Sequence, residues 1–285
     1  MATVAEILIS RKEDMTRAER QLSDVIMDNY PISGLGSTTE LAAAAGVSTP
    51  TVARLVQKLG FAGYPTFQAA LRSELGAMIQ DPVSKRETWQ THLPQEHILS
   101  RYAEAAQDNI RRTLENMDLG DFDGVCGLLA DPNRRVYITG GRLSSTLARS
   151  LYLHLQMIRP DVVLIPGEAS WPHIILDIKP GDVFVVFDIR RYENQSLTMG
   201  EMAHNRGAKL VLFTDQWRSP LDRLADHTLA GRISVPSAWD SGMSLMLLVE
   251  SLIAAVQEEH WETVKERTDA LEQAFDQTRL FRKFT

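Results

Sequence analysis

The sequence has very little cysteine and no long apolar run. Cys126 is the only cysteine among 285 residues, which excludes an internal disulfide framework and a zinc site built from cysteines. A buried thiol is the simplest interpretation of Cys126. No apolar run is long enough to cross a membrane, and the first fifteen residues lack the basic start and cleavage site of a signal peptide. We therefore expect a cytoplasmic protein with no membrane partner.

The short motifs that carry common enzyme chemistry are also missing. The chain has no Walker lysine, no nucleophile elbow, and no His, Asp and Glu cluster at metal-ligand spacing. Glu168, His173 and His204 are available acids or bases, but no second residue at a telling spacing supports any of them. We therefore expect no catalytic residue, no metal and no cofactor, and a structural role for these side chains.

The charge is acidic overall but not everywhere. The net charge is −7, and residues 1–79 hold seven lysines and arginines against eight acidic residues. Between Ala43 and Ser73, however, every charged residue is basic, namely Arg54, Lys58 and Arg72. Such a local cluster favours contact with a polyanion that the net charge disfavours. With so few cations per subunit, useful affinity for DNA would need more than one subunit.

The stretch from Thr38 to Leu59, TTELAAAAGVSTPTVARLVQKL, predicts a helix–turn–helix. Apolar residues recur at helical spacing on both sides of Gly46, which suits a tight turn because glycine adopts a positive φ at little cost. Ser48 can cap the second helix and Gly60 can end it. The polar residues predicted to face outward on that helix are Ser48, Thr49, Thr51, Arg54 and Lys58. A short helical hairpin can also belong to a core, but this hydroxyl-rich outer face favours a helix that enters a DNA groove.

Helical periodicity dominates the first part of the chain. It predicts helices over 15–30, with Thr16 and Glu19 as a capping box, and over 65–79, 95–117 and 125–130. The polar, proline-bounded segment 81–94 indicates a linker. The predicted organisation is a DNA-binding domain over 1–79, a linker over 80–94 and a second domain over 95–285.

From Arg135 the period changes. RRVYITGG, VVLIPG, GDVFVVFD and AKLVLFTD are short β-rich runs, DHTLAG is a possible fifth strand, and helices are predicted over 143–158 and 194–206. This alternation indicates a parallel sheet with helices on both faces, followed by helices over 239–259 and 262–284. The predicted fold class is thus an all-α helix–turn–helix domain plus an α/β domain.

Ligands of parallel sheets bind at the carboxyl ends of the strands, and two loops there carry suitable groups. The loop 139–145 has two glycines and two serines, and the loop 188–195 has two adjacent arginines that suit a carboxylate or phosphate. An ordinary turn and solvated arginines paired with Asp188 or Glu193 are the alternatives. A third loop, 214–223, is expected to be structural. The candidate effector-binding residues are Gly140, Gly141, Ser144, Ser145, Asp188, Arg190, Arg191 and Asn194.

Almost the whole chain resembles the RpiR family of bacterial transcriptional regulators. The N-terminal half is similar through AERQLSDVIMDN and STTELAAAAGVSTPTVARLVQKLGFAGYPTFQAAL. The C-terminal half is similar to the sugar isomerase (SIS) domain through VYITGGRLSSTLA, KPGDVFVVFD, NRGAKLVLFTD and SPLDRLAD. The resemblance implies a head that binds an operator as a dimer or higher oligomer, and a SIS domain that senses a metabolite, commonly a phosphosugar.

One segment departs from that family. After the third strand the family has a serine-rich run whose hydroxyls hold the phosphate, whereas this chain has Asp188, Ile189, Arg190, Arg191, Tyr192 and Glu193. The effector expected here is a small anion, and a sugar acid or another carboxylate fits two arginines as well as a phosphosugar does.

The leading hypothesis is a ligand-responsive regulator that binds double-stranded DNA as a homodimer or homotetramer. In it, Ser48, Thr49, Thr51 and Arg54 reach base edges, Lys58 and Tyr64 hold phosphates, and Thr39 is a further DNA-binding candidate. Two alternatives stay open. The chain could be a sugar-phosphate isomerase with a helical appendage, or its SIS domain could serve only in oligomerisation.

Overall fold

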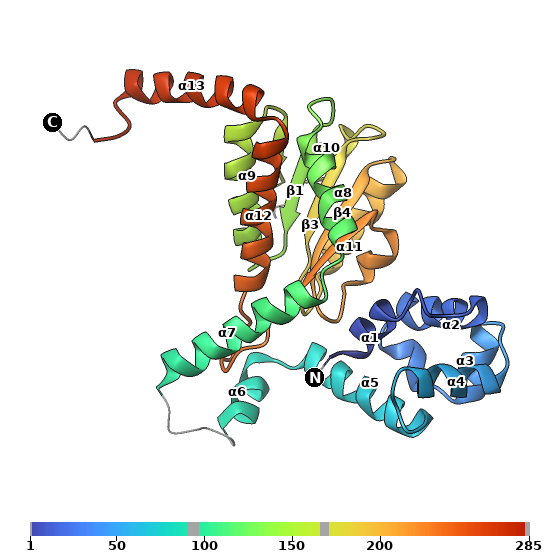
Figure 1. The fold of residues 1–285 in the computed structure, drawn as a ribbon. Coiled ribbons are helices and arrows are strands. Elements are labelled where there is room, and N and C mark those ends of the chain that lie inside the picture. Colours follow the sequence, from blue (N-terminus) through green and yellow to red (C-terminus); the bar gives the residue numbers. More distant parts are fainter. Residues whose placement is uncertain (1, 91–96, 166–170, 283–285) are drawn as a thin grey trace.

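A computed structural model describes residues 2–90, 97–165 and 171–282. It consists of a helical head, formed by the first 79 residues, and an α/β body (Figure 1). Both parts of the predicted fold class are confirmed. Glu168, one of the candidate acids, lies outside the described residues.

The head contains α1 (Val4–Ser10), α2 (Arg17–Asp28), a 3-10 turn η1 (Ile32–Leu35), α3 (Thr38–Ala44), α4 (Thr49–Lys58) and α5 (Tyr64–Ile79). Thr16 and Glu19 form the predicted capping box at the start of α2. Gly46 lies between α3 and α4 with φ +61°, which confirms the predicted turn. The small core buries apolar side chains of all five helices, including Leu8, Leu22, Leu41, Leu55 and Phe67. Helix α1, begun by its own Thr3–Glu6 capping box, was not predicted.

Within the described residues, three helices connect the head to the sheet. α6 (Pro82–Gln90) lies within the predicted linker, and α7 (Ile98–Glu115) follows the predicted helix over 95–117 closely. α8 (Leu119–Ala130) begins six residues earlier than predicted, because the Asp118 carboxylate accepts hydrogen bonds from the backbone N–H groups of Gly120 and Asp121.

All five predicted strands are present. They are β1 (Val136–Gly140), β2 (Val162–Leu164), β3 (Val183–Phe187), β4 (Lys209–Asp215) and β5 (His227–Gly231). Every pair is parallel, and the order in the sheet is β2-β1-β3-β4-β5. The chain order therefore reverses between β1 and β3, which is the switch point at which such sheets bind ligands.

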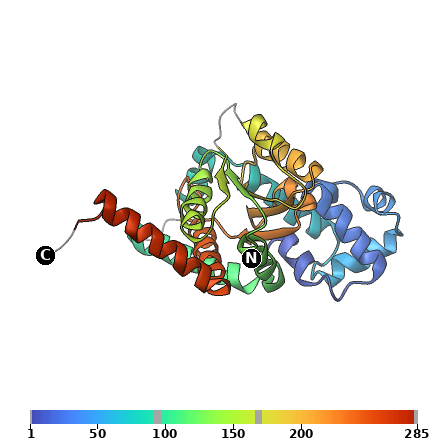
Figure 2. The same cartoon turned by 90° about the horizontal axis from the view of Figure 1, so that it is seen from above.

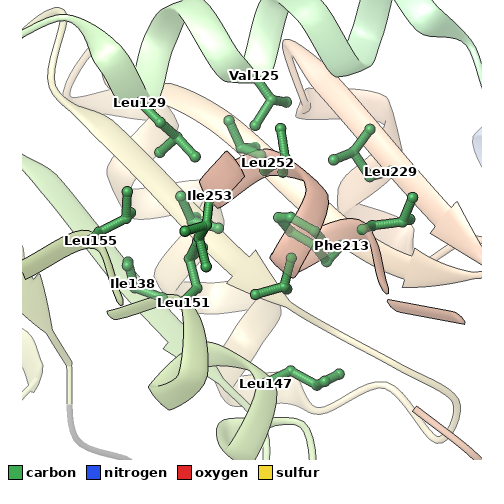
Figure 3. Close-up of a cluster of buried hydrophobic side chains, with 14 of the residues drawn as sticks. Val125, Leu129, Ile138, Leu147, Leu151, Leu155, Phe213, Leu229, Leu252 and Ile253 are labelled. Carbon is green, nitrogen blue, oxygen red and sulfur yellow. The ribbon is translucent and has the colours of Figure 1, made fainter. Parts of the chain in front are cut away.

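Helices cover both faces of the sheet (Figures 1 and 2). α8, α9 (Ser145–Ile158) and α12 (Met243–Glu259) pack on one face through a large apolar cluster, part of which is drawn in Figure 3. α10 (Trp171–Leu176), α11 (Asn194–Asn205) and the 3-10 turn η2 (Pro220–Leu224) cover the other face. Successive residues of a strand face opposite sides, so Ile138 belongs to the first cluster and Tyr137 to the second.

The chain ends in α13 (Trp261–Thr278), which projects away from the sheet (Figure 1). α12 begins at Met243 rather than at the predicted Trp239, since residues 232–242 form an irregular segment beside the strand ends. No helix in the described parts of the chain is long and apolar enough to cross a membrane.

The head contacts the body at the carboxyl edge of the sheet. The Thr3 hydroxyl donates to the carbonyl of Gln216, just after β4, at 3.2 Å. Arg232, just after β5, donates from Nε to the Glu6 carboxylate at 3.0 Å, and both side chains are largely buried. The same edge carries the ends of β1 and β3, so the head lies close to the switch point.

Candidate functional site

α4 lies at the end of the head remote from the sheet (Figure 1). The α4 segment exposes Ser48, Thr49 and Arg54, three of the side chains predicted to face outward. Ser48 occupies the N-cap position, although its hydroxyl bonds to the Thr51 hydroxyl at 2.9 Å instead of a backbone N–H. No described residue of the body covers these three side chains, so this surface is accessible to a groove of DNA.

Three predicted DNA contacts have other partners here. Thr51 is 7% exposed and not outward, because it lies one turn from Leu55 on the buried side of α4. The Lys58 ammonium donates to the Asp14 carbonyl at 2.5 Å and forms a 2.9 Å ion pair with Glu19. Tyr64 donates its hydroxyl proton to backbone carbonyls of the 31–37 loop at 3.1 Å. For these side chains the structure favours a role inside the head.

The start of α2 carries basic residues that the sequence analysis did not single out. Arg17, Arg20 and Gln21 line a surface groove of about 700 Å³. Gln21 lies next to the turn of the helix–turn–helix, since a Cβ on Gly46 would be 3.6 Å from its amide nitrogen. Because Arg17, Arg20 and Gln21 are spaced i, i+3 and i+4, the sequence alone could have placed them on one face of the helix. They supply positive charge and hydrogen-bond donors beside the turn.

Thr39, in the first turn of α3, is exposed as a phosphate contact requires. Its neighbour Glu40 closes a capping box with Ser37, and hydrogen bonds from Ser37 lower the pKa of that carboxyl. An ionised Glu40 repels phosphate, which weakens the case for Thr39.

The body has a cavity of about 1050 Å³ at its switch point. Its walls come from the loop after β1, the loop after β3, the segment before α12, and α6 and α7. Of the predicted effector residues it contains Gly141, Ser144, Asp188, Arg190 and Arg191. Residues of two loops that are distant in the sequence therefore line one cavity.

Gly140, Ser145 and Asn194 are not among the residues that form the cavity wall. A Cβ on Gly140 would lie 2.9 Å from the backbone of Ser144, so this glycine allows the chain to turn tightly from β1 into α9. Asn194 begins α11 and is exposed, and Ser145 donates its hydroxyl proton to the Arg142 carbonyl at 3.1 Å.

The two predicted arginines differ in their surroundings. Arg191 is exposed and has a positive φ of 63°. The Arg190 guanidinium is almost fully buried, where Nε lies 3.0 Å from Asp240 and Nη1 donates to the Ala77 carbonyl at 3.1 Å. Asp240 also binds the Lys85 ammonium at 2.6 Å. Arg190, Asp240 and Lys85 form a buried ion network that joins the cavity wall to α5 and α6.

Two buried carboxyl groups lie behind the loop after β3. Burial raises the pKa of Asp188 and of Asp215 to about 6. The Ser219 hydroxyl and the Glu193 N–H donate to Asp188, while the backbone N–H groups of Arg190 and Trp217 donate to Asp215. These hydrogen bonds fix the shape of the arginine loop.

The candidate acid–base residues form no catalytic arrangement in the described residues. His173 on α10 and His204 on α11 are exposed, and neither lines the cavity. The described residues contain no group of three or more His, Cys, Asp or Glu side chains that could hold a metal ion. Cys126 is buried as predicted, and burial raises the pKa of its thiol to about 11.

An exposed helix–turn–helix, joined to an α/β body with a cavity at its switch point, defines a DNA-binding regulator with a ligand-sensing domain. Residues 2–78 match the helix-turn-helix domain of the rpiR family, and residues 128–255 match the SIS domain. The chain therefore has the domain architecture of RpiR transcriptional regulators, an rpiR-type helix-turn-helix domain followed by a SIS domain.

The chain is similar to named regulators over most of its length. It is 26% identical to the HTH-type transcriptional regulator HexR of Pseudomonas aeruginosa over 254 residues, which cover 86% of this chain and 84% of HexR. It is 24% identical to the HTH-type transcriptional regulator GlvR of Bacillus subtilis, over 66% of this chain and 67% of GlvR.

Solved structures share the fold. The Vibrio vulnificus NanR protein, complexed with ManNAc-6P, aligns with 97% of this chain and 100% of its own, with a TM-score of 0.58 and 20% identity. The sugar isomerase domain of an RpiR transcription factor from Sphaerobacter thermophilus covers 62% of this chain and 99% of its own, with a TM-score of 0.59 and 17% identity.

Proposed function

We propose that this regulator reads an operator with α4 and changes its DNA affinity when a small anionic metabolite enters the switch-point cavity. The proposal rests on where its two sites, α4 and the switch-point cavity, lie in the fold. α4 is free at the far end of the head, while the cavity wall is tied by the buried ion network to α5 and α6. A ligand that displaces Arg190 or Asp240 would therefore also move α5, the helix that forms the base of the head, and α6, which follows it.

Arg54 is the α4 residue best placed to determine DNA binding. Its side chain is exposed, and its guanidinium donates to the Thr51 hydroxyl at 3.2 Å, which directs it along the helix surface. Ser48 and Thr49 offer hydroxyls for base edges or phosphates. Arg17 and Arg20 on α2 add phosphate contacts, which act on all sequences alike.

The test is a gel shift of the full chain on fragments recovered by genomic footprinting. Arg54→Ala should weaken specific binding by ~1–3 kcal/mol if Arg54 contacts a base. Arg149→Ala on α9 is the matched control, because it removes the same charge from an exposed position on the body. Equal affinities of wild type, Arg54→Ala and Arg149→Ala would remove Arg54 from the interface.

The effector class follows from the groups at the cavity. Three arginines (Arg142, Arg190 and Arg191) line it together with the start of α9, and guanidinium groups bind carboxylates and phosphates in two-point geometry. A phosphosugar, of the kind named with NanR, and a sugar acid or other carboxylate are the candidate chemistries. A bound effector should raise the melting temperature in proportion to the logarithm of its concentration once binding saturates.

We further propose that the chain is not an enzyme. The relatives are named as transcriptional regulators, and the exposed His173 and His204 lie away from the cavity wall. Turnover of a sugar phosphate that is lost in His173→Ala would support an isomerase instead.

A homodimer or homotetramer is the proposed binding form. Exposed apolar side chains on α9 and α13, including Leu153, Met157 and Trp261, offer a surface for a second copy of the chain. A dimer would place two α4 helices on half-sites about 34–36 Å apart or a multiple of that. Sedimentation equilibrium measures the state, and a monomer at micromolar concentration would contradict it.

A further inference from the structure

The backbone of the loop before α9 offers an anion seat, at Gly141 and Arg142, that a side chain of the same chain already fills. The Arg142 backbone N–H donates to Oε1 of Glu193 at 2.8 Å. A Cβ placed on Gly141 would lie 2.7 Å from that same oxygen, so the carboxylate rests directly on the glycine. This N–H lies in the loop three residues before α9, and Glu193 is its acceptor.

The nearby hydroxyl groups are also occupied. Ser144 donates its proton to the Phe187 carbonyl at 2.8 Å, and Thr146 donates to the Leu143 carbonyl at 2.8 Å. A hydroxyl that has donated its proton offers only lone pairs to a ligand, and lone pairs repel phosphate oxygens. The hydroxyl groups of Ser144 and Thr146 are thus not free donors for a phosphate group.

Two guanidinium groups remain as charged donors at the cavity. Arg142 and Arg191 are exposed, and within the described residues neither side chain has a partner, whereas Arg190 is held by Asp240. Glu193 lines the same cavity, so a dianionic group meets a carboxylate as well as two cations. A planar monocarboxylate matches the fork of one guanidinium and brings a single charge.

The rest of the wall is mostly apolar. The side chains that cover the loop ends and the start of α12 are hydrophobic: Leu143, Ile189, Trp239, Met243 and Met246. A cavity of about 1050 Å³ with such walls is larger and less polar than a small polyol requires. It suits an effector with an apolar or aromatic body.

We infer that Glu193 fills the phosphate position of this pocket, so that the effector is a monocarboxylate with an apolar body held by Arg142 and Arg191. This inference rests on the proposed function, and it narrows the anionic metabolite to one chemical class. Glu193 is then the residue that excludes phosphate esters.

The test compares wild type with Glu193→Ala, which empties the seat, and Glu193→Gln, which keeps it filled without the charge. Glu201→Ala is the matched control, because Glu201 is an acidic residue of the same helix that pairs with Arg223 away from the cavity. Calorimetric titrations of the full chain would use glucose 6-phosphate, inorganic phosphate and a panel of monocarboxylates such as 3-phenylpropionate. Circular dichroism would check that each variant is folded.

We expect wild type and Glu201→Ala to bind a monocarboxylate and not glucose 6-phosphate. Glu193→Ala should gain at least tenfold in affinity for glucose 6-phosphate, Glu193→Gln should gain less, and Arg191→Ala should lose at least tenfold for the carboxylate. Tight binding of glucose 6-phosphate by wild type, or no gain in Glu193→Ala, would overturn the inference while leaving a sensing pocket in place. If no anion binds any variant, the sensing part of the proposed function fails as well.

Discussion

Asp240→Asn should destabilise the protein strongly, because Asp240 is the acidic centre of the buried ion network. Its carboxylate lies 2.6 Å from the Lys85 ammonium and 3.0 Å from Nε of Arg190. Both cationic side chains are about 5% exposed, while Asp240 is 22% exposed. An asparagine can accept one hydrogen bond there, but its NH₂ group then faces the second cation.

The magnitude follows from the burial of the two cations. Removing one member of a buried pair costs about 3–5 kcal/mol, since an uncompensated charge is left behind. The low end, about 3 kcal/mol, applies here because Lys85 keeps the Trp239 carbonyl and Arg190 keeps the Ala77 carbonyl as acceptors. For a chain of this length, that loss lowers the melting temperature by roughly 5–10 °C.

Urea denaturation followed by circular dichroism measures the effect. The control is Glu201→Gln, which breaks the solvent-exposed pair with Arg223 and should cost less than about 1 kcal/mol. If Asp240→Asn loses no more stability than Glu201→Gln, the network does not hold the base of the head to the cavity wall. The proposed coupling of the two sites would then lack its physical basis.

Two further predictions concern the turn and the buried carboxyls. Gly46→Ala should lower the free energy of unfolding by about 1–2 kcal/mol, because a side chain strains its φ of +61°. Gly76→Ala should instead stabilise the protein, because Gly76 lies inside α5 with open space at its Cβ position. An equal response of both variants in urea denaturation would contradict this prediction. Because the pKa of Asp188 is raised to about 6 in the folded chain, protonation favours folding as the pH falls from 6 to 4. Wild type should gain up to about 3 kcal/mol relative to Asp188→Asn between pH 7 and pH 4, and parallel stability curves would refute this assignment.

The elements were largely predictable because their burial patterns are local. Runs such as VFVVF are buried on both sides of the sheet, so β-branched and aromatic residues stand next to one another in the sequence. The weak fifth strand, HTLAG, pairs with β4 as predicted. The missed α1 is only seven residues long, and short helices give little periodicity to detect.

The sites were less predictable because their partners are distant in the chain. Lys58 pairs with Glu19, and Arg190 pairs with Asp240. No local sequence pattern predicts either ion pair. The outward orientation predicted for Thr51 was wrong for a different reason. It lies at the edge of the apolar face of α4, where a polar residue can turn either outward or, as here, toward Ser48 and Arg54.

The parallel sheet gives the head and the cavity a common border. All five strands end at one rim, and Gln216 and Arg232 at that rim hold the first helix of the head. The cavity and the first helix of the head therefore lie at the same edge, and a shift of the strand-end loops would reach that helix without crossing the interior of the sheet. If the proposed effector moves these loops, the head should move with them while the buried layers behind them stay rigid.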